Sequence, residues 1–212
     1  MIQDVINYIG DNYAIFRREV ENIKEFNNEK PRNHDQWGTN VDPGIYSHVE
    51  TTEAWTLSCP DMSDGMWYHF PVVVNGKVST AAKNLTPETA EFFETIDGLY
   101  MVGFSLMFGR SMIVPHTDNP HVPDKECGQW TYHLGIICPP HCHLIQNGFA
   151  IPERNGHVIR FRTCEVHGAV NMSDLPRVIM FISFLTDDPV IKNIDTYKHA
   201  DSSGDGLRSF TA

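Results

Sequence analysis

The stretch LYMVGFSLMFGRSMIVPH, residues 99–116, holds two short runs rich in β-branched and aromatic residues, with Gly109 and Arg110 between them. Runs of this length, bounded by turn residues, are typical of β-strands. Comparable runs follow at 130–138, 142–149, 157–163, 165–170 and 177–185. About seven such strands predict an all-β sandwich or barrel, and we expect a jelly-roll core.

The chain ahead of these strands has a helical pattern. Residues 1–26 carry apolar side chains at steps of three and four, which predicts one amphipathic helix, or two helices broken near Gly10. The segment 27–45 is rich in Asn, Pro, Gly and Asp and is expected to be a loop. Thr-Pro-Glu at 86–88 supplies a capping hydroxyl, a first-turn proline and an acid, so a helix is predicted from there to about Asp97. Its buried face would be formed by Ala90, Phe92, Phe93 and Ile96.

The composition is that of a folded globular protein. The chain has 212 residues, 41% of them hydrophobic and 20% charged, and a formal net charge of −11. Such a charge argues against a nucleic-acid binder, which needs a basic face. No apolar run approaches the roughly 20 residues that span a bilayer, and Asp4 and Asp11 argue against a secretory signal. We expect a soluble cytoplasmic protein that binds neither nucleic acid nor membrane.

The five cysteines lie at irregular positions. This spacing does not fit a disulfide framework and favours a reducing compartment. Cys138 and Cys142 alternate with His141 and His143 in a manner that would suit a zinc cluster. A second matched pair is lacking, however, and Pro139-Pro140 indicates a turn between strands. We therefore favour the turn.

The opening stretch ends in His116-Thr117-Asp118. Residues i and i+2 of a strand point to the same side, so His116 and Asp118 can face one point if His116 ends a strand. A third ligand must come from another strand, and His167 in EVHGAV is the natural candidate. Two imidazoles and one carboxylate on one face of a metal ion leave three neighbouring coordination positions open, which is typical of non-haem Fe(II) oxygenases. This geometry suits 2-oxoglutarate as co-substrate, with dioxygen at the remaining position.

Arg177 opens the run RVIMFISF, which is apolar on both faces and therefore predicts an inner strand. A cation at the end of a buried strand is costly unless it is paired. The distal carboxylate of 2-oxoglutarate would be such a partner, and the rigid fork of arginine suits it well.

The segment from about Trp67 to Phe184 resembles the aspartyl/asparaginyl β-hydroxylase family of Fe(II)/2-oxoglutarate-dependent dioxygenases. GFSLMFGRSMIVPHTD, YHLGI, EVHGAV and PRVIMFISF carry the resemblance, in the family's order and at its spacing. WYHFPVVVNGK also resembles the family's entry segment. The resemblance implies a mainly β fold, a cupin-like double-stranded β-helix with N-terminal and flanking helices, which agrees with the strand count.

The resemblance also implies roles for individual residues. His116 and His167 match the two iron-binding histidines of the family. Arg177 matches the arginine that holds the distal carboxylate of 2-oxoglutarate, and Ser105 matches a serine that assists it. His133 matches a histidine that contacts the proximal, C1 end of the co-substrate.

Two positions depart from the family pattern. The best-described animal members have glycine where this chain has Asp118, so a full facial triad of His116, Asp118 and His167 becomes possible here. Those members also have an arginine where this chain has Thr131. The C1 carboxylate must then be neutralised mainly by the metal, by His133, or by another residue such as Arg110.

Several candidates also have a structural interpretation. His116 could be an ordinary hydrogen-bonded strand-end histidine, Asp118 could cap the turn that follows it, and Ser105 could satisfy a backbone group. Arg160 and Arg162 alternate with apolar residues and share one face. That face is either a solvated outer surface or a patch that holds a carboxylate of the substrate.

Together these features predict a single-domain dioxygenase that hydroxylates an unactivated carbon and releases succinate and CO2. Its substrate would be an aspartyl, asparaginyl or related amino-acid unit, free, peptidyl or carrier-bound. Residues 1–66 would shape the substrate pocket, 67–186 would form the catalytic core, and 187–212 would be a polar tail or flap. The alternatives are a non-catalytic cupin-like metal-binding module and a metal-dependent hydrolase or isomerase on the same scaffold.

Overall fold

The computed structural model describes residues 2–27, 53–58, 63–64, 66–117, 130–184 and 189–192, which are called the described residues below. The helices lie in the first half of the chain. They are α1 (Ile2–Asp11), α2 (Tyr13–Glu19), the 3-10 helix η1 (Val20–Asn22), α5 (Thr80–Leu85) and α6 (Pro87–Glu94).

The strands form two large sheets and one small sheet. The major sheet contains β1 (Phe26–Asn27), β2 (Trp55–Leu57), β3 (Trp67–Val74), β4 (Lys77–Val78), β6 (Leu99–Met107), β8 (Thr131–Ile137), β11 (Val158–Phe161) and β13 (Arg177–Phe184). The minor sheet contains β7 (Ser111–His116), β9 (Cys142–Gln146), β10 (Phe149–Pro152) and β12 (His167–Asn171). The small sheet pairs β5 (Ile96–Asp97) with β14 (Val190–Ile191).

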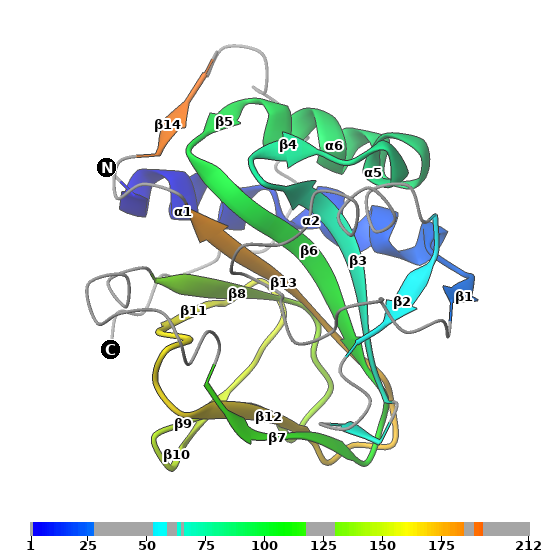
Figure 1. Ribbon diagram of the computed structural model, residues 1–212, viewed down its shortest axis with the longest axis vertical. Coiled ribbons are helices and arrows are strands. Elements are labelled where there is room, and N and C mark those ends of the chain that lie inside the picture. The colour runs from blue at the N-terminus through cyan, green and yellow to red at the C-terminus, as the bar shows by residue number, and fades with distance from the viewer. Residues whose placement is uncertain are drawn as a thin grey trace.

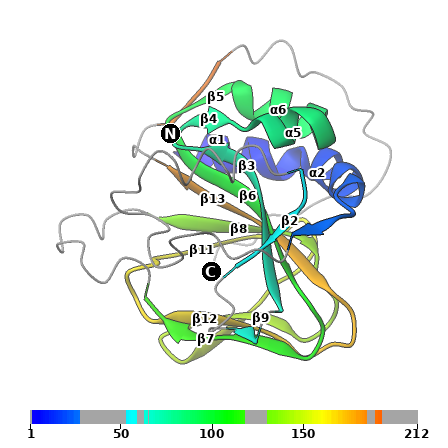
Figure 2. The same ribbon diagram turned by 45° about the vertical axis from the view of Figure 1, so that its right-hand side comes forward.

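From β6 onward the chain alternates between the two large sheets. The major sheet has the order β3-β6-β13-β8-β11 in this region, and the minor sheet has the order β10-β9-β12-β7. The β6–β13, β13–β8 and β12–β7 pairs are all antiparallel. Strands connected in this way form the double-stranded β-helix, or jelly roll. Figures 1 and 2 show the minor sheet facing the lower part of the major sheet, and the predicted fold class is confirmed.

The α-helices cover the outer face of the major sheet (Figure 1). Val102, Phe104 and Leu106 of β6 belong to one hydrophobic cluster with residues of α1, α2 and α6. Successive side chains of a strand point to opposite faces, so Ser105 and Met107 face the minor sheet instead. The main core therefore lies between sheet and helices, which leaves the inner face of the major sheet for polar side chains.

The amphipathic front segment forms two helices rather than one. The break lies at Asn12, between α1 and α2, close to the predicted position near Gly10. The backbone N–H of Asn12 donates to Ile9 O (3.2 Å) and so closes the last turn of α1. Val5, Ile6 and Ile9 are the buried residues of α1, as steps of three and four require.

Helix α6 begins directly after Thr86, where the sequence predicts it, but its cap is a different residue. The Thr86 hydroxyl donates to Ala82 O (3.2 Å) in the preceding helix. The Glu19 carboxylate accepts instead from the N–H groups of Glu88 (3.0 Å) and Thr89 (2.7 Å). A carboxylate is favourable at a helix N-terminus, and this one fixes α2 against α6.

The sequence pattern does not predict β3, although β3 pairs with β6 over most of its length. Proline cannot donate to a strand ladder, so Pro71 argues against a central strand. The pairing register with β6 shifts between Pro71 and Val73, which is the irregularity that accommodates the proline.

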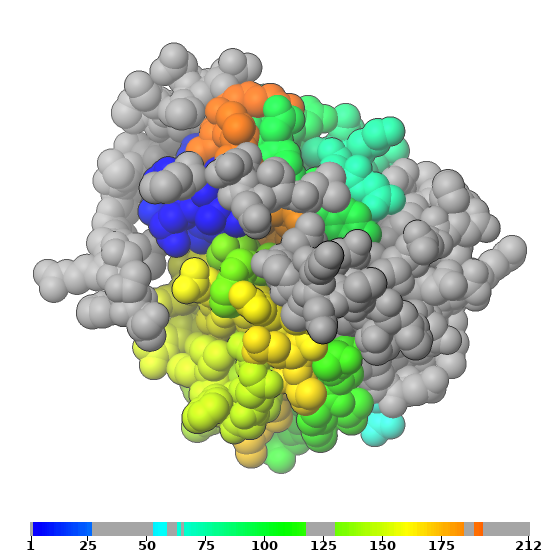
Figure 3. Space-filling view, turned by 60° about the vertical axis from the view of Figure 1, so that its left-hand side comes forward, coloured from blue at the N-terminus to red at the C-terminus, as the bar shows by residue number. Residues whose placement is uncertain are grey.

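Part of the predicted tail is ordered as β14, which pairs with β5. Figure 3 shows β14 meeting α1 on the surface, above the part of the chain that contains β9 and β10. None of the helices in the described ranges combines the length and the apolar character needed to cross a bilayer.

The cysteines differ from the expected set of reduced thiols. Cys138 and Cys142 are free, whereas Cys164 is disulfide-bonded. Cys59 and Cys127 lie outside the described residues. Spacing along the chain did not indicate this bond, because a disulfide depends on which thiols meet in space.

Candidate active site

His116 and His167 lie side by side on the minor sheet. His116 is the last residue of β7 and His167 the first of β12, and the two are directly paired across the ladder. Their ring centroids are 4.4 Å apart. The register shifts immediately after His167, at Gly168, where an added Cβ would lie only 2.6 Å from Ile113 O. The glycine of EVHGAV thus allows the close strand approach that brings the two imidazoles together.

Both imidazoles are oriented by the backbone of their own strands. His116 Nδ1 lies 2.8 Å from Val114 O, and His167 Nδ1 lies 2.9 Å from Glu165 O. A carbonyl oxygen only accepts, so each Nδ1 carries the proton. Metal coordination would then use Nε2 of each ring, with the Nδ1–H bond fixing its orientation, as is usual for histidine ligands.

Asp118, the predicted third ligand, lies outside the described residues. The described ranges contain no group of three or more His, Cys, Asp or Glu side chains placed to hold a metal ion. Cys138, Cys142 and the neighbouring histidines therefore do not form the zinc cluster considered from the sequence. The donor set that the described structure brings together is the pair His116 and His167.

A line of aromatic rings connects the histidine pair with the interior of the barrel. The Phe161 ring centroid lies 5.2 Å from that of His167 and 4.6 Å from that of His133. His133 is on β8 and faces inward, opposite Phe181 of β13. It therefore occupies an intermediate position between the histidine pair and Arg177.

Arg177 is buried at the start of β13, with 1% of its surface exposed, and its partner is a protein carboxylate. Arg177 Nε donates to Glu153 Oε2 (2.6 Å), and Nη2 donates to Glu153 Oε1. His133 Nδ1 lies 3.3 Å from the same Oε1 atom. The expectation that a buried arginine needs a carboxylate is correct, but Glu153 rather than a ligand provides it in this structure.

Glu153 reaches the interior because the chain after β10 crosses directly over β8. An added Cβ on Gly135 would lie 2.1 Å from Arg154 O, so only glycine fits there. The crossing is fixed by backbone hydrogen bonds from Gly156 N to Gly135 O (2.8 Å) and from Glu153 N to Cys142 O (2.9 Å). The glycine of the YHLG motif therefore positions the carboxylate that holds Arg177.

The charge states of the buried cluster of Glu153, Arg177, Cys138 and Cys142 are well defined. Burial alone would raise the pKa of Glu153, but Arg177 and the His133 contact outweigh it and lower that pKa to about 2. Burial raises the pKa of Cys138 to about 12 and that of Cys142 to about 11. At neutral pH the cluster thus contains an ionised glutamate, an arginine and two protonated thiols.

Acid should remove the stabilisation that this ion pair gives. The folded-state pKa of Glu153, about 2, lies below the ordinary value of 4.5, so the contribution is complete above pH 4.5 and is lost as the pH falls toward 2. A shift of this size corresponds to about 3 kcal/mol. Urea unfolding of wild type and Glu153→Gln should show a stability gap that closes by about 2 kcal/mol, most of this amount, between pH 5 and pH 2.5.

Glu21→Gln is the matched control, because Glu21 forms an exposed pair with Arg17. Its stability difference from wild type should stay within about 1 kcal/mol over the same pH range. A gap between wild type and Glu153→Gln that does not change with pH would contradict the assignment of Glu153 as the acid-sensitive group.

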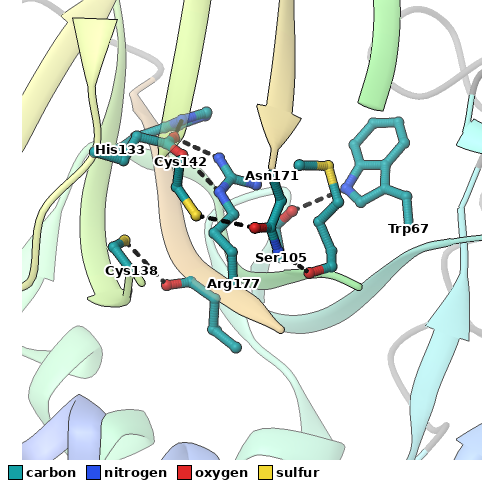
Figure 4. Close-up of polar contacts among 10 residues, drawn as sticks. Trp67, Ser105, His133, Cys138, Cys142, Asn171 and Arg177 are labelled. Atoms are coloured by element: carbon teal, nitrogen blue, oxygen red, sulfur yellow. Dashed lines mark hydrogen bonds and ion pairs between the residues drawn. The ribbon is translucent and has the colours of Figure 1, made fainter. Parts of the chain in front are cut away.

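Ser105 and Trp67 form a second polar pair on the inner face (Figure 4). Trp67 Nε1 donates to Ser105 Oγ (2.8 Å), and Ser105 is buried. Trp67 and Arg177 both lie opposite Met107, from the two strands that flank β6. Ser105 is two residues from Met107 on the same face, and diagonal neighbours of this kind are within reach of long side chains.

Asn171 closes the end of the barrel next to Arg177. Its Nδ2 donates to Phe108 O (3.1 Å) and Leu175 O (2.7 Å), and its Oδ1 accepts from Ser173 N (3.1 Å). These bonds join the β6–β7 and β12–β13 turns. The histidine pair lies at the opposite ends of β7 and β12, so a ligand that contacts both the histidines and Arg177 must extend along the barrel.

Four other residues considered from the sequence have clear locations. Thr131 begins β8 and pairs with Ser183 of β13. Arg110 was a candidate for neutralising the C1 carboxylate, but it lies in the β6–β7 turn, largely exposed and paired with Asp174. It is remote from His116, which ends β7, so this candidate is wrong. The guanidinium carbons of Arg160 and Arg162 lie 4.7 and 4.8 Å from the centroid of Trp130.

Sequence reasoning missed Glu153 and the polar role of Trp67. Glu153 is followed by Arg154, Asn155 and Gly156, a run that indicates an exposed turn rather than a buried carboxylate. The free-energy cost of burying the Arg177 charge indicates that an acidic partner exists. That cost does not identify which residue the partner is. Trp67 lies in the segment that resembles the family's entry segment, and the need of its indole N–H for an acceptor was the available signal.

The chain is similar to one known protein family and to a set of solved structures. The family model for aspartyl/asparaginyl β-hydroxylase matches residues 6–187. No curated protein matches the sequence. Among solved structures, a predicted oxalate decarboxylase from Thermotoga maritima has 12% identity and a TM-score of 0.37, over 57% of this chain and 81% of that one. The Cupin_2 domain of an XRE family transcriptional regulator from Enterobacter cloacae has 12% identity and a TM-score of 0.36, over 56% and 96%.

Proposed function

Because this chain belongs to the aspartyl/asparaginyl β-hydroxylase family, we propose that it is an Fe(II)- and 2-oxoglutarate-dependent dioxygenase. It hydroxylates an unactivated carbon of an amino-acid-type substrate, aspartyl, asparaginyl or related, and releases succinate and CO2. The observation that carries the proposal is the pair of imidazoles from His116 and His167, 4.4 Å apart at paired strand ends.

The donor set fits a ferrous ion. His116 and His167 present Nε2, and Asp118 is assigned as the carboxylate that completes a facial triad. Two imidazoles and one carboxylate leave coordination positions for 2-oxoglutarate and dioxygen. Iron with these co-substrates supplies the oxidising power for hydroxylation, whereas the protein's own side chains bind, orient and exclude water.

The inner face of the major sheet fits the co-substrate. Arg177 receives the distal carboxylate of 2-oxoglutarate, and Ser105 assists it with Trp67 fixing the serine hydroxyl. His133 lies between Arg177 and the histidine pair and contacts the C1 end. With Arg110 paired elsewhere, His133 and the metal are the remaining candidates for neutralising the C1 carboxylate.

The rival assignments require different chemistry at the same site. A hydrolase or isomerase needs only a metal-bound water, and a non-catalytic module needs no open coordination position. Arg177 alone does not separate these readings, because Glu153 already accounts for its burial. Consumption of 2-oxoglutarate separates them directly.

Anaerobic addition of Fe(II) and 2-oxoglutarate should produce the visible charge-transfer band of the chelate, and admission of oxygen should then yield succinate. Ser105→Ala should raise the concentration of 2-oxoglutarate needed for half-maximal formation of the band by about tenfold, because one hydrogen bond to a charged group contributes about 1.5 kcal/mol. Asp118→Ala should eliminate succinate formation.

Ser111→Ala is the matched serine control. Its hydroxyl donates to Phe108 O in the β6–β7 turn and does not belong to the inner face beside Arg177. It should leave the half-saturation concentration unchanged. Wild-type protein that binds Fe(II) but forms no band and no succinate would support the rival assignments and reject the proposal.

A further inference from the structure

Two arginines and a tryptophan gather at one edge of the major sheet. The guanidinium carbons of Arg160 and Arg162 lie 4.7 and 4.8 Å from the centroid of the Trp130 ring. We propose that these three side chains form a subsite that binds an acidic group of the substrate, several residues away from the carbon that is hydroxylated. The inference rests on the proposed function, because it takes the histidine pair as the reacting centre, and it specifies the substrate as an acidic peptide.

The subsite lies at the same end of the barrel as the histidine pair. Trp130 directly precedes β8, which pairs with β11, the strand that carries Arg160 and ends just before Arg162. Phe161 lies between the two arginines, and its ring centroid is 5.2 Å from that of His167. Strand β11 is at the end of the major sheet, next to β8 (Figure 2). An extended substrate bound at the histidines can therefore reach this edge.

The two arginines lie on the outer face of the sheet. Successive side chains of a strand alternate between faces, so Arg160 and Arg162 share the face opposite to Phe161. Tyr132, which pairs with Arg160, belongs to the core between the major sheet and the helices. Arg160 is exposed, whereas Arg162 and Trp130 are half-buried. A ligand group that crosses the edge of β11 from the reacting centre can therefore contact them.

Neither arginine is paired with a carboxylate of the described residues. Several other arginines of the chain do form such ion pairs: Arg17, Arg18, Arg110 and Arg177. The Nε atom of Arg162 is also buried without a hydrogen-bond acceptor from the described part of the chain. The chain has a formal net charge of −11, yet it leaves these two neighbouring cations without a carboxylate. They are therefore available to an anion from outside the protein.

Trp130 holds the two guanidinium groups close together. Their carbons are within about 10 Å of each other, a distance at which like charges still repel at ordinary ionic strength. Attraction of each cation to the aromatic ring offsets this repulsion. A guanidinium on a ring uses its face for that contact, so the N–H groups along its edge remain free to bind a carboxylate through parallel hydrogen bonds. A carboxylate at the subsite also removes the repulsion, which a neutral group does not.

The position of the subsite sets a minimum length for the substrate. Packed sheets lie about 10 Å apart, so side chains reach roughly 5 Å from each face of a sheet. A group bound on the outer face is then on the order of 10–15 Å from the histidine rings, measured over the edge of β11. An extended chain covers about 3.5 Å per residue, so about four residues separate the acidic group from the hydroxylated one. A free amino acid is too short to reach both places.

Fluorescence anisotropy with matched labelled peptides measures the subsite independently of turnover. Both peptides carry a central aspartate. About four residues away on each side, the acidic peptide has glutamate and the neutral peptide has glutamine. The protein is loaded with Fe(II) and 2-oxoglutarate in the absence of oxygen. Wild type should bind the acidic peptide about tenfold more tightly, the combined effect of two partly exposed charge pairs. Added salt should reduce this preference, because it screens the charges.

The double variant Arg160→Gln with Arg162→Gln should bind both peptides as wild type binds the neutral one. Trp130→Leu keeps both charges but removes the ring, and it should reduce the preference to about threefold. Arg154→Gln is the matched control, because Arg154 is exposed and lies at the crossing over Gly135; it should keep the full preference. The reversal Arg160→Glu with Arg162→Glu should instead favour a peptide with lysine at the two positions.

The outcomes separate the subsite from the proposed function. A wild-type protein that forms neither the chelate band nor succinate rejects the proposed function, whichever peptide it binds. Equal binding of the acidic and neutral peptides by wild type, or no binding of either, overturns the subsite and leaves the proposed function in place. A preference that survives in the glutamine double variant also overturns it. Arginines that only stabilise the sheet edge would lower the melting temperature of that variant and leave the peptide preference unchanged.

Discussion

His167→Ala is expected to lower the affinity for Fe(II) by well over about 100-fold and to abolish succinate formation. Loss of residues that merely orient a metal ligand costs roughly 10- to 100-fold in affinity, and loss of a ligand itself costs more. His116→Ala should have the same effect, because the two rings are paired across the β7–β12 ladder and present the same nitrogen. Anaerobic calorimetry with Fe(II) measures the affinity independently of turnover.

His157→Ala controls for the removal of a histidine as such. His157 is exposed and makes its backbone hydrogen bonds through both groups, since its O accepts from Gly135 N (3.0 Å) and its N–H donates to Arg154 O (3.1 Å). This variant should bind Fe(II) like wild type. If His116→Ala and His167→Ala are folded by circular dichroism and keep wild-type iron affinity, the two imidazoles are not metal ligands and the assigned chemistry fails.

The parts of the fold that depend on local pattern were predictable. The strand runs after residue 99 carry their own turn signals, and each corresponds to a strand or a hairpin in the double-stranded β-helix. The proximity of His116 and His167 could also be predicted. His116 was expected at the end of a strand, and the family spacing identified His167 as its partner. Local sequence patterns thus predicted the strands, and the resemblance to the family predicted how those strands pair across the barrel.

Long-range partners were not predictable from local pattern. Glu19 caps α6 although it lies about 70 residues earlier in the chain. The sequence Thr-Pro-Glu at 86–88 does not indicate this contact, because it predicts Thr86 as the capping residue. Glu153 pairs with Arg177 from a run that looks like an exposed turn. In both cases burial selects the partner, and burial is a property of the assembled fold rather than of the segment.

Arg177→Ala is expected to destabilise the protein by about 3–5 kcal/mol, because it leaves Glu153 as a buried carboxylate without its cation. The same change should weaken 2-oxoglutarate binding by at least about 30-fold, the effect of losing about 2 kcal/mol from a buried charge pair. Urea unfolding gives the first quantity, and anaerobic titration of the Fe(II)-loaded protein gives the second.

The double variant Arg177→Met with Glu153→Leu separates these two effects. Replacing both members of a buried ion pair by apolar residues of similar size is often neutral or stabilising, so most of the lost stability should return. Binding of 2-oxoglutarate should not return, because no cation remains to receive its distal carboxylate. Arg18→Ala, which removes an exposed partner of Glu88, should change stability by less than about 1 kcal/mol. Recovery of stability together with 2-oxoglutarate binding in the double variant would show that Arg177 serves the fold alone.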